Sequence, residues 1–278
     1  MTFQNSKIIS RLFDEFRGSF TKDIRIYFTY PTAVIGDAIS IPLWFVLFVL
    51  AGITFDASAF TTKATFQHAV SFFFWGFVFI TLLSTNLSGL AQYLTSEQAI
   101  GVLEQIFLTP ASRVAIVAGR WARVMVTDLI VLATTTLFLF AVLRTPLIVE
   151  NPISVFLLLA TLEFGLLGAG MILAGLSLRI KSIASYANYA WLAVMILCGV
   201  FYPPSSLPQP LETISLLLPP TYFADLIKHF AVGTKTIIPV PFELGLDIFF
   251  ALIFLIAGLF VFFRMERLAK RQGTLAFT

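Results

Sequence analysis

Long apolar runs dominate the pattern of hydrophobic and polar positions along this chain. Six windows are each long enough to cross about 30 Å of hydrocarbon as a helix that rises about 1.5 Å per residue. They cover residues 31–52, 69–90, 124–143, 153–178, 183–201 and 242–263. The pattern therefore predicts an all-α integral membrane protein with six transmembrane helices.

Composition agrees with a membrane protein. Hydrophobic residues make up 58% of the 278 residues and charged residues 12%, whereas soluble domains carry about a quarter charged residues. The only cysteine, Cys198, lies inside an apolar run, so neither a disulfide framework nor a thiol pair is expected. The first apolar run is too long for the core of a signal peptide, and we expect it to remain as a span.

The distribution of Lys and Arg predicts the orientation of the spans. If the N-terminus lies in the cytosol, only four of the 18 basic residues fall on the outer side: Lys63, Arg144, Lys228 and Lys235. The remaining 14 are cytosolic, and such an excess marks the inner side of a membrane protein. We therefore expect a multi-pass protein of the cell membrane with both termini in the cytosol.

Residues 1–30 show a helical pattern ahead of the first span. Apolar side chains recur every three or four residues at Ile9, Leu12, Phe16 and Phe20, with charged residues between them. This pattern predicts an amphipathic helix in the cytosolic headgroup layer; a soluble surface helix shows a similar pattern, but the adjoining span favours the interface. The chain then divides into this interfacial helix (1–30), a six-span transmembrane domain (31–264) and a cytosolic C-terminal tail (265–278).

The fourth window is rich in small residues. Its segment GLLGAGMILAG, residues 165–175, contains the pairs Gly165/Ala169 and Gly170/Ala174 at one-turn spacing. Small residues at this spacing let a second helix approach closely within a membrane.

A polar-faced segment, TSEQAIGVLEQIFLTP, separates the second and third windows at residues 95–110. Thr95 and Gln98 form a capping-box pattern, which predicts a helix that starts at Thr95. Thr109 followed by Pro110 predicts the N-cap and first position of the next helix. Two interpretations stay open for this helix: it presents a contact surface to a partner in the cytosol, or it is a connector that lies on the headgroups.

Prolines divide the segment between the fifth and sixth windows, residues 202–241. After Pro203 and Pro204, residues 211–218 are apolar, and Pro219 and Pro220 separate them from a helical pattern that includes Tyr222. Neither piece is long enough to span. We expect two short re-entrant helices in the outer leaflet, with an ordinary surface loop as the alternative.

Five acidic residues fall inside the apolar windows. Asp37 and Asp128 lie near the cytosolic boundary, where a carboxylate can reach the headgroups or meet Arg120 and Arg123. Glu163 lies deepest and is expected to face the bundle interior, either as part of a substrate or proton path or as a packing residue. Glu243 and Asp247, at the outer end of the last window, are interpreted as interfacial.

Metal, nucleotide and catalytic motifs are not apparent. His68 and His229 are far apart in sequence, and one cysteine adds no ligand set. The pattern G-x-x-x-x-G-K-[ST] of nucleotide-binding loops does not occur. The sequence therefore predicts no catalytic residue, no metal site and no cofactor on this chain.

Two stretches carry a family resemblance. The run Glu97-x3-Gly101-x2-Glu104-x5-Pro110 resembles the cytosolic coupling-helix region of ABC-2 type permeases, although the family usually has a basic residue where this chain has Gln98. Residues 199–228, with their paired prolines and the closing Pro220-Thr221-Tyr222, are similar to that family's extracellular loop before the last span.

The resemblance implies a function and partners. Such a chain would be the permease subunit of an ATP-driven exporter for a drug, lipid or glycan, paired with a second permease copy, identical or different. A separate ATPase would bind ATP and Mg²⁺ and dock on the coupling helix. The resemblance assigns that contact to Glu97, Gly101, Leu103, Glu104, Phe107 and Pro110. It implies no nucleic-acid partner.

Two other classes of protein remain as alternatives. A secondary transporter driven by an ion gradient would use Glu163 as its coupling site, but residues 1–143 and 153–278 show no inverted repeat of the kind common in that class. A membrane enzyme is disfavoured because polar catalytic residues do not cluster.

Overall fold

A computed structural model describes residues 2–55, 63–101, 105, 109, 112–180 and 183–272. Over these ranges the chain forms helices and no strand, so the all-α prediction is confirmed for the described residues. The long helices are α1 (Thr2–Thr29), α2 (Pro31–Phe55), α3 (Lys63–Ala99), α5 (Arg113–Leu143), α6 (Pro152–Ser177), α7 (Ile183–Leu197) and α10 (Val240–Gln272). The short ones are η2 (Pro204–Ser206), α8 (Gln209–Leu217) and α9 (Pro219–Val232).

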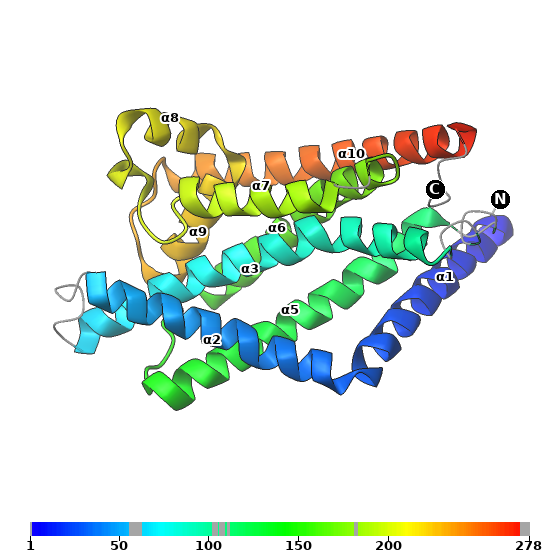
Figure 1. The fold of residues 1–278 in the computed structure, drawn as a ribbon. Helices are drawn as coiled ribbons and strands as arrows, with labels where there is room; N and C mark the ends of the chain where they lie inside the picture. The colour runs from blue at the N-terminus through cyan, green and yellow to red at the C-terminus, as the bar shows by residue number, and fades with distance from the viewer. Residues whose placement is uncertain are drawn as a thin grey trace.

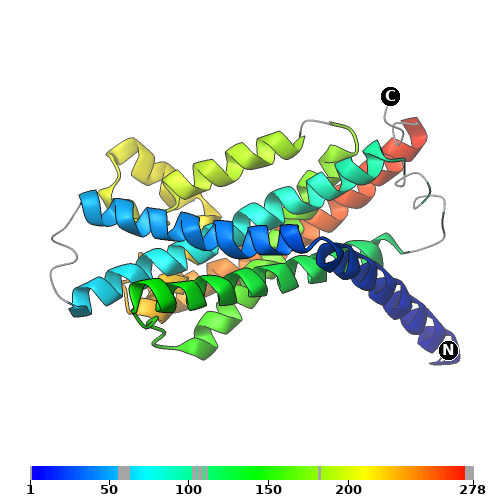
Figure 2. The ribbon, with the colours of Figure 1, turned by 60° about the horizontal axis from the view of Figure 1, so that its bottom comes forward.

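The long helices after α1 lie side by side in one elongated bundle (Figure 1). The start of α1 and the end of α10 lie at the same end of this bundle, and α8 and α9 lie at the other (Figure 1). Helix α1 turns out of the bundle beside the start of α2 (Figure 2). The axes of its segment 10–29 and of segment 34–50 in α2 meet at 78°.

Among the described residues, four helices are individually long and apolar enough to cross a membrane: α3, α5, α6 and α10. A fifth crossing is possible if the bent pair of α1 and α2 counts as one span, and α7 is apolar over Ser185–Leu197 but short. The chain is therefore a multi-pass membrane protein, while the count of six spans stays a prediction. Residues from 265 onward, predicted as a tail, continue α10 as far as Gln272.

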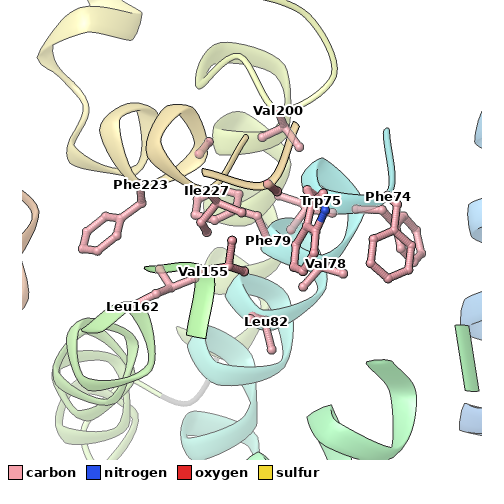
Figure 3. Close-up of a cluster of buried hydrophobic side chains, with 14 of the residues drawn as sticks. Phe74, Trp75, Val78, Phe79, Leu82, Val155, Leu162, Val200, Phe223 and Ile227 are labelled. Atoms are coloured by element: carbon pink, nitrogen blue, oxygen red, sulfur yellow. The ribbon is translucent and has the colours of Figure 1, made fainter. Parts of the chain in front are cut away.

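Aromatic residues of α3 form the centre of the bundle. Phe74 and Phe79 are fully buried, and the ring of Phe74 meets that of Phe45 in α2 edge to face at 5.7 Å. Side chains of α3 meet Phe223 and Ile227 of α9 in the same cluster, together with residues of α6 (Figure 3). Because lipid is as apolar as these side chains, close packing rather than exclusion of water holds such helices together.

Helix α6 packs closely against two neighbours through its glycines, as the sequence predicted. A Cβ added at Gly165 would lie 3.3 Å from the Cα of Ala251 in α10, and one at Gly170 would lie 2.8 Å from the backbone oxygen of Asn86 in α3. Between them, Gly168 faces the backbone of α10 directly, and Gly258 of α10 faces Gly168 in return. The small residues of α6 therefore allow backbone-to-backbone contact on two sides.

The proline-rich segment forms two short helices, as predicted. Pro219 and Pro220 occupy the first turn of α9, where a missing N–H costs nothing. Thr221 Oγ1 donates to the carbonyl of Ser215 at 2.6 Å, and Tyr222 Oη donates to that of Leu216 at 2.7 Å, so α8 folds back on α9. Pro203 directly precedes the short helix η2, in which Pro204 is buried. Entry of α8 and α9 into the outer leaflet stays a prediction.

The predicted orientation can be tested by cysteine labelling. Ser206 in η2 and Ser10 in α1 are exposed, and the segment around α8 lies at the opposite end of the bundle from the start of α1 (Figure 1). The native Cys198 is buried, which keeps the background low. We expect an impermeant maleimide to label Ser206→Cys on intact cells and to label Ser10→Cys only after permeabilisation. Labelling of both variants from the same side would contradict the orientation.

Candidate functional site

The connection between α3 and α5 begins later than the sequence suggested. Helix α3 continues without a break to Ala99, and Thr95 Oγ1 donates to the carbonyl of Ala91 at 2.9 Å, as a side chain within a helix does. The predicted helix start at Thr95 is therefore wrong. The physical reason is that each residue added to α3 gains a backbone hydrogen bond, and residues 95–100 contain no glycine or proline that would end the helix before Gly101. Gly101, with φ of 72°, adopts the left-handed conformation typical just after a helix.

The N-cap of α5 is also displaced from its predicted position. Ser112, not Thr109, caps this helix: its side chain accepts a hydrogen bond from the backbone N–H of Ala115. Of the residues that the resemblance assigned to the ATPase contact, the structure describes Glu97 and Gly101. The others, Leu103, Glu104, Phe107 and Pro110, lie outside the described residues.

Helix α1 contacts both ends of this connection. At its beginning, Lys22 Nζ donates to Glu97 Oε1 at 3.1 Å. At its end, the backbone N–H of Ser112 donates to Glu15 Oε2 at 2.7 Å, and this bond lowers the pKa of the Glu15 carboxyl. Glu97 is mostly buried by these contacts. We call Glu15 and Lys22, with their partners Ser112 and Glu97, the α1 clasp.

A second set of polar contacts fixes α1 to the bundle beyond the clasp. Asp23 lies 3.7 Å from Arg120 of α5, and burial raises the pKa of this carboxyl. The guanidinium of Arg123 lies over the ring of Tyr27, 4.7 Å from its centroid. Tyr27 Oη in turn donates to Asp37 Oδ2 of α2 at 3.1 Å. Part of α1 is therefore docked on protein, which the prediction of a helix lying on headgroups did not include.

Close backbone contact accompanies these bonds. A Cβ added at Gly119 of α5 would lie 2.8 Å from the carbonyl oxygen of Phe16, and Ser19 Oγ donates to the carbonyl of Ile116. Arg113, in the first turn of α5, forms an ion pair at 3.3 Å with Glu266 of α10. The start of α5 is thus held by helices from both ends of the chain.

A polar groove of about 460 Å³ lies among α2, α3 and α5. It extends from Ser96, beside the clasp, past Arg120 and Arg123 to Asp128. Asp128 and Val131 also line a second, apolar cavity among α3, α5 and α6. The groove and the apolar cavity therefore share one carboxyl in their linings, that of Asp128.

Asp128 and Glu163 lie in the bundle interior and line the same cavity. Asp128 accepts hydrogen bonds from Thr85 Oγ1 at 3.1 Å and Asn86 Nδ2 at 3.3 Å, both from α3, rather than from the arginines that the sequence suggested. Glu163 faces inward, as predicted. The sequence did not predict that Asp128 and Glu163 line one cavity, because they lie on different helices and are 35 positions apart.

The acidic pair of α10 is buried within the protein, which we did not predict from the sequence, while its place at the membrane interface stays a prediction. Glu243 and Asp247 of α10 have no exposed surface, because α9 packs over this end of α10. Lys228 of α9 is also buried; its ammonium donates to the carbonyl of Gly199 and lies 4.2 Å from the ring centroid of Phe72. The sequence signal for their burial was the presence of two acidic residues one turn apart on an otherwise apolar helix.

No metal-binding group emerges from the part of the chain that the structure describes, because it holds no cluster of three or more His, Cys, Asp or Glu suited to an ion. The geometry is that of a multi-pass membrane protein with an internal cavity and a connection between α3 and α5 that α1 holds at both ends.

Comparison with known families agrees with this class. The model of the ABC-2 type transporter family matches residues 33–231, which is well over half of the chain. The chain therefore belongs to the ABC-2 type transporter family, and it is a permease component rather than a catalytic domain. Among proteins of curated function, none matches significantly.

Proposed function

We propose that this chain is the membrane subunit of an ATP-driven exporter, which moves a substrate out of the cytosol and works with a separate ATPase and a second permease copy. ATP and Mg²⁺ would bind to the ATPase. The cytosolic connection between α3 and α5, residues 97–112, would be the surface on which the ATPase docks. The observation that supports this most is the α1 clasp, which holds both ends of the connection.

The clasp provides a physical route for the coupling. A push on the connection moves Glu97 and Ser112 together, since both are bonded to α1. Helix α1 is also bonded to α5 through Asp23 and to α2 through Tyr27. Movement at the connection would therefore reach α2, α3 and α5, the three helices that surround the polar groove.

The docking surface can be tested by co-purification. We expect Leu103→Asp combined with Phe107→Ala to leave the permease inserted but to prevent co-purification with its ATPase partner. Buried apolar anchors of this kind contribute about 2 kcal/mol or more each to an interface. The matched control is Leu217→Asp with Phe242→Ala, the same substitutions at exposed positions on the outer end. Normal co-purification of the first double variant would exclude this docking surface.

A further inference from the structure

The apolar cavity among α3, α5 and α6 has a volume of about 370 Å³. Its size is within the range of about 300 to 1,000 Å³ that small-molecule sites occupy. Two large apolar residues on its rim are exposed, Leu129 at 63% and Phe156 at 69%. Because these helices lie in the membrane, the cavity opens toward lipid or toward a neighbouring permease copy.

Polar atoms on the inner wall of this cavity have no hydrogen-bond partner in the described structure. They are Oε2 of Glu163, whose residue is 5% exposed, and Oγ1 of Thr135, whose residue is 2% exposed. The carboxyl of Asp128 lines the same wall but is held by Thr85 and Asn86. Glu163 has only the neutral donors Trp121 and Asn86 beside its carboxyl, which leaves acceptor capacity at Oε2 for a bound molecule.

The charges around the cavity are unbalanced. The acidic side chains that line it are Asp128 from α5 and Glu163 from α6, and α3 supplies the neutral Thr81 to the lining and Thr85 and Asn86 as partners of Asp128. The polar neighbours of Glu163 are Trp121 and Asn86, and the basic residue that acts on Asp128 is Arg123, which lines the other cavity. Carboxyls buried in apolar surroundings are stabilised by a cation that pairs with them.

We propose that this cavity binds a cationic amphiphile, with its ammonium head between Asp128 and Glu163 and its hydrocarbon body against the apolar wall. Glu163 Oε2 and Thr135 Oγ1 would accept hydrogen bonds from the N–H groups of the head. The end of the hydrocarbon body would extend out of the cavity between Leu129 and Phe156. The inference rests on the proposed function, because it names the class of molecule that the permease would move.

Binding can be measured on the purified permease without any ATPase, in phosphatidylcholine nanodiscs. The probe is radiolabelled dodecylammonium, corrected for its partition into empty nanodiscs. We expect saturable binding, and we expect dodecanol and dodecyl sulfate, which have the same chain but no positive charge, to compete at least about tenfold more weakly. Equal competition by all three would show that charge is not recognised and would overturn the proposal.

Two variants locate the site. Glu163→Gln keeps the side-chain volume and should weaken binding about tenfold or more, because the counter-charge is lost. Ala160→Phe should abolish binding by filling the cavity that Ala160 lines. The control is Asp247→Asn, which removes an equally buried carboxyl of α10 outside this cavity. Thermal midpoints of all variants are compared, and if Ala160→Phe misfolds, the isosteric Glu163→Gln decides alone.

Wild-type affinity in Glu163→Gln would overturn the assignment. Because the assay contains no ATPase, its failure leaves the docking experiment unaffected, and failure of docking leaves this binding result standing.

Discussion

Replacing Gly168 by leucine is expected to separate α6 from α10 and to prevent the permease from accumulating as a monodisperse protein. Gly168 and Gly258 meet backbone to backbone, so no flexible side chain can move aside for an added Cβ. Overpacking of a well-packed interior costs about 1–3 kcal/mol. We expect the cost here to exceed that range, because two helix backbones would have to move apart.

The measurement is the thermal midpoint of detergent-solubilised protein, followed by fluorescence size exclusion. The matched control is Gly245→Leu, which lies on α10 as well but has open space around its Cβ position. This variant should keep the wild-type midpoint to within a few degrees, since exposed substitutions change stability by about 0.5 kcal/mol or less. A stable, monodisperse Gly168→Leu variant would contradict the packing of α6 on α10.

The contact between α6 and α10 also shows how far the sequence could predict the fold. The one-turn spacing of small residues identified α6 as a helix that other helices approach closely. In the structure, α10 approaches Gly165 and α3 approaches Gly170. The pattern could not say which helix approaches. Gly258 lies about 90 positions away, in a window of mostly large apolar residues with a few small ones, and nothing in its local sequence marked it as the partner of Gly168.

Local signals failed where two of them competed. Thr95 and Gln98 satisfy the capping-box pattern, but a side-chain cap adds only about 1 kcal/mol, and continuing the helix from α3 gains a backbone hydrogen bond at every residue. The buried state of Glu243 and Asp247 depends on α9 covering them, and this contact is tertiary. The same holds for the pairing of Asp128 with Glu163 in one cavity.

Sequence and structure assign different roles to Glu97. The family resemblance assigns Glu97 to the ATPase contact, whereas the structure pairs it with Lys22 of α1. The two roles make different predictions for charge reversal. If Glu97 acts through the clasp, exchanging the two charges should restore what either single reversal destroys.

We expect Glu97→Lys to lower the rate of ATP hydrolysis by the reconstituted complex about fivefold or more. This factor is at the low end of the effects that coupling between two sites typically produces. Two cations would then face each other where the 3.1 Å ion pair stood, and the α1 clasp would open at one end. Thermal stability should change little, because the Lys22 side chain is 44% exposed and such pairs are worth about 1 kcal/mol or less. Loss of coupling without loss of folding is the signature of the clasp.

The double variant Lys22→Glu with Glu97→Lys should recover half or more of the hydrolysis rate, because the pair is rebuilt with its charges exchanged. Arg17→Ala is the control: Arg17 is an exposed cation of α1 outside the clasp, and its loss should leave the rate unchanged. A single Glu97→Lys variant with the wild-type rate would show that the clasp carries no coupling. If instead the double variant stays as slow as the single one, Glu97 contacts the ATPase directly, because a partner that requires a carboxylate at this position gains nothing from a new one on α1.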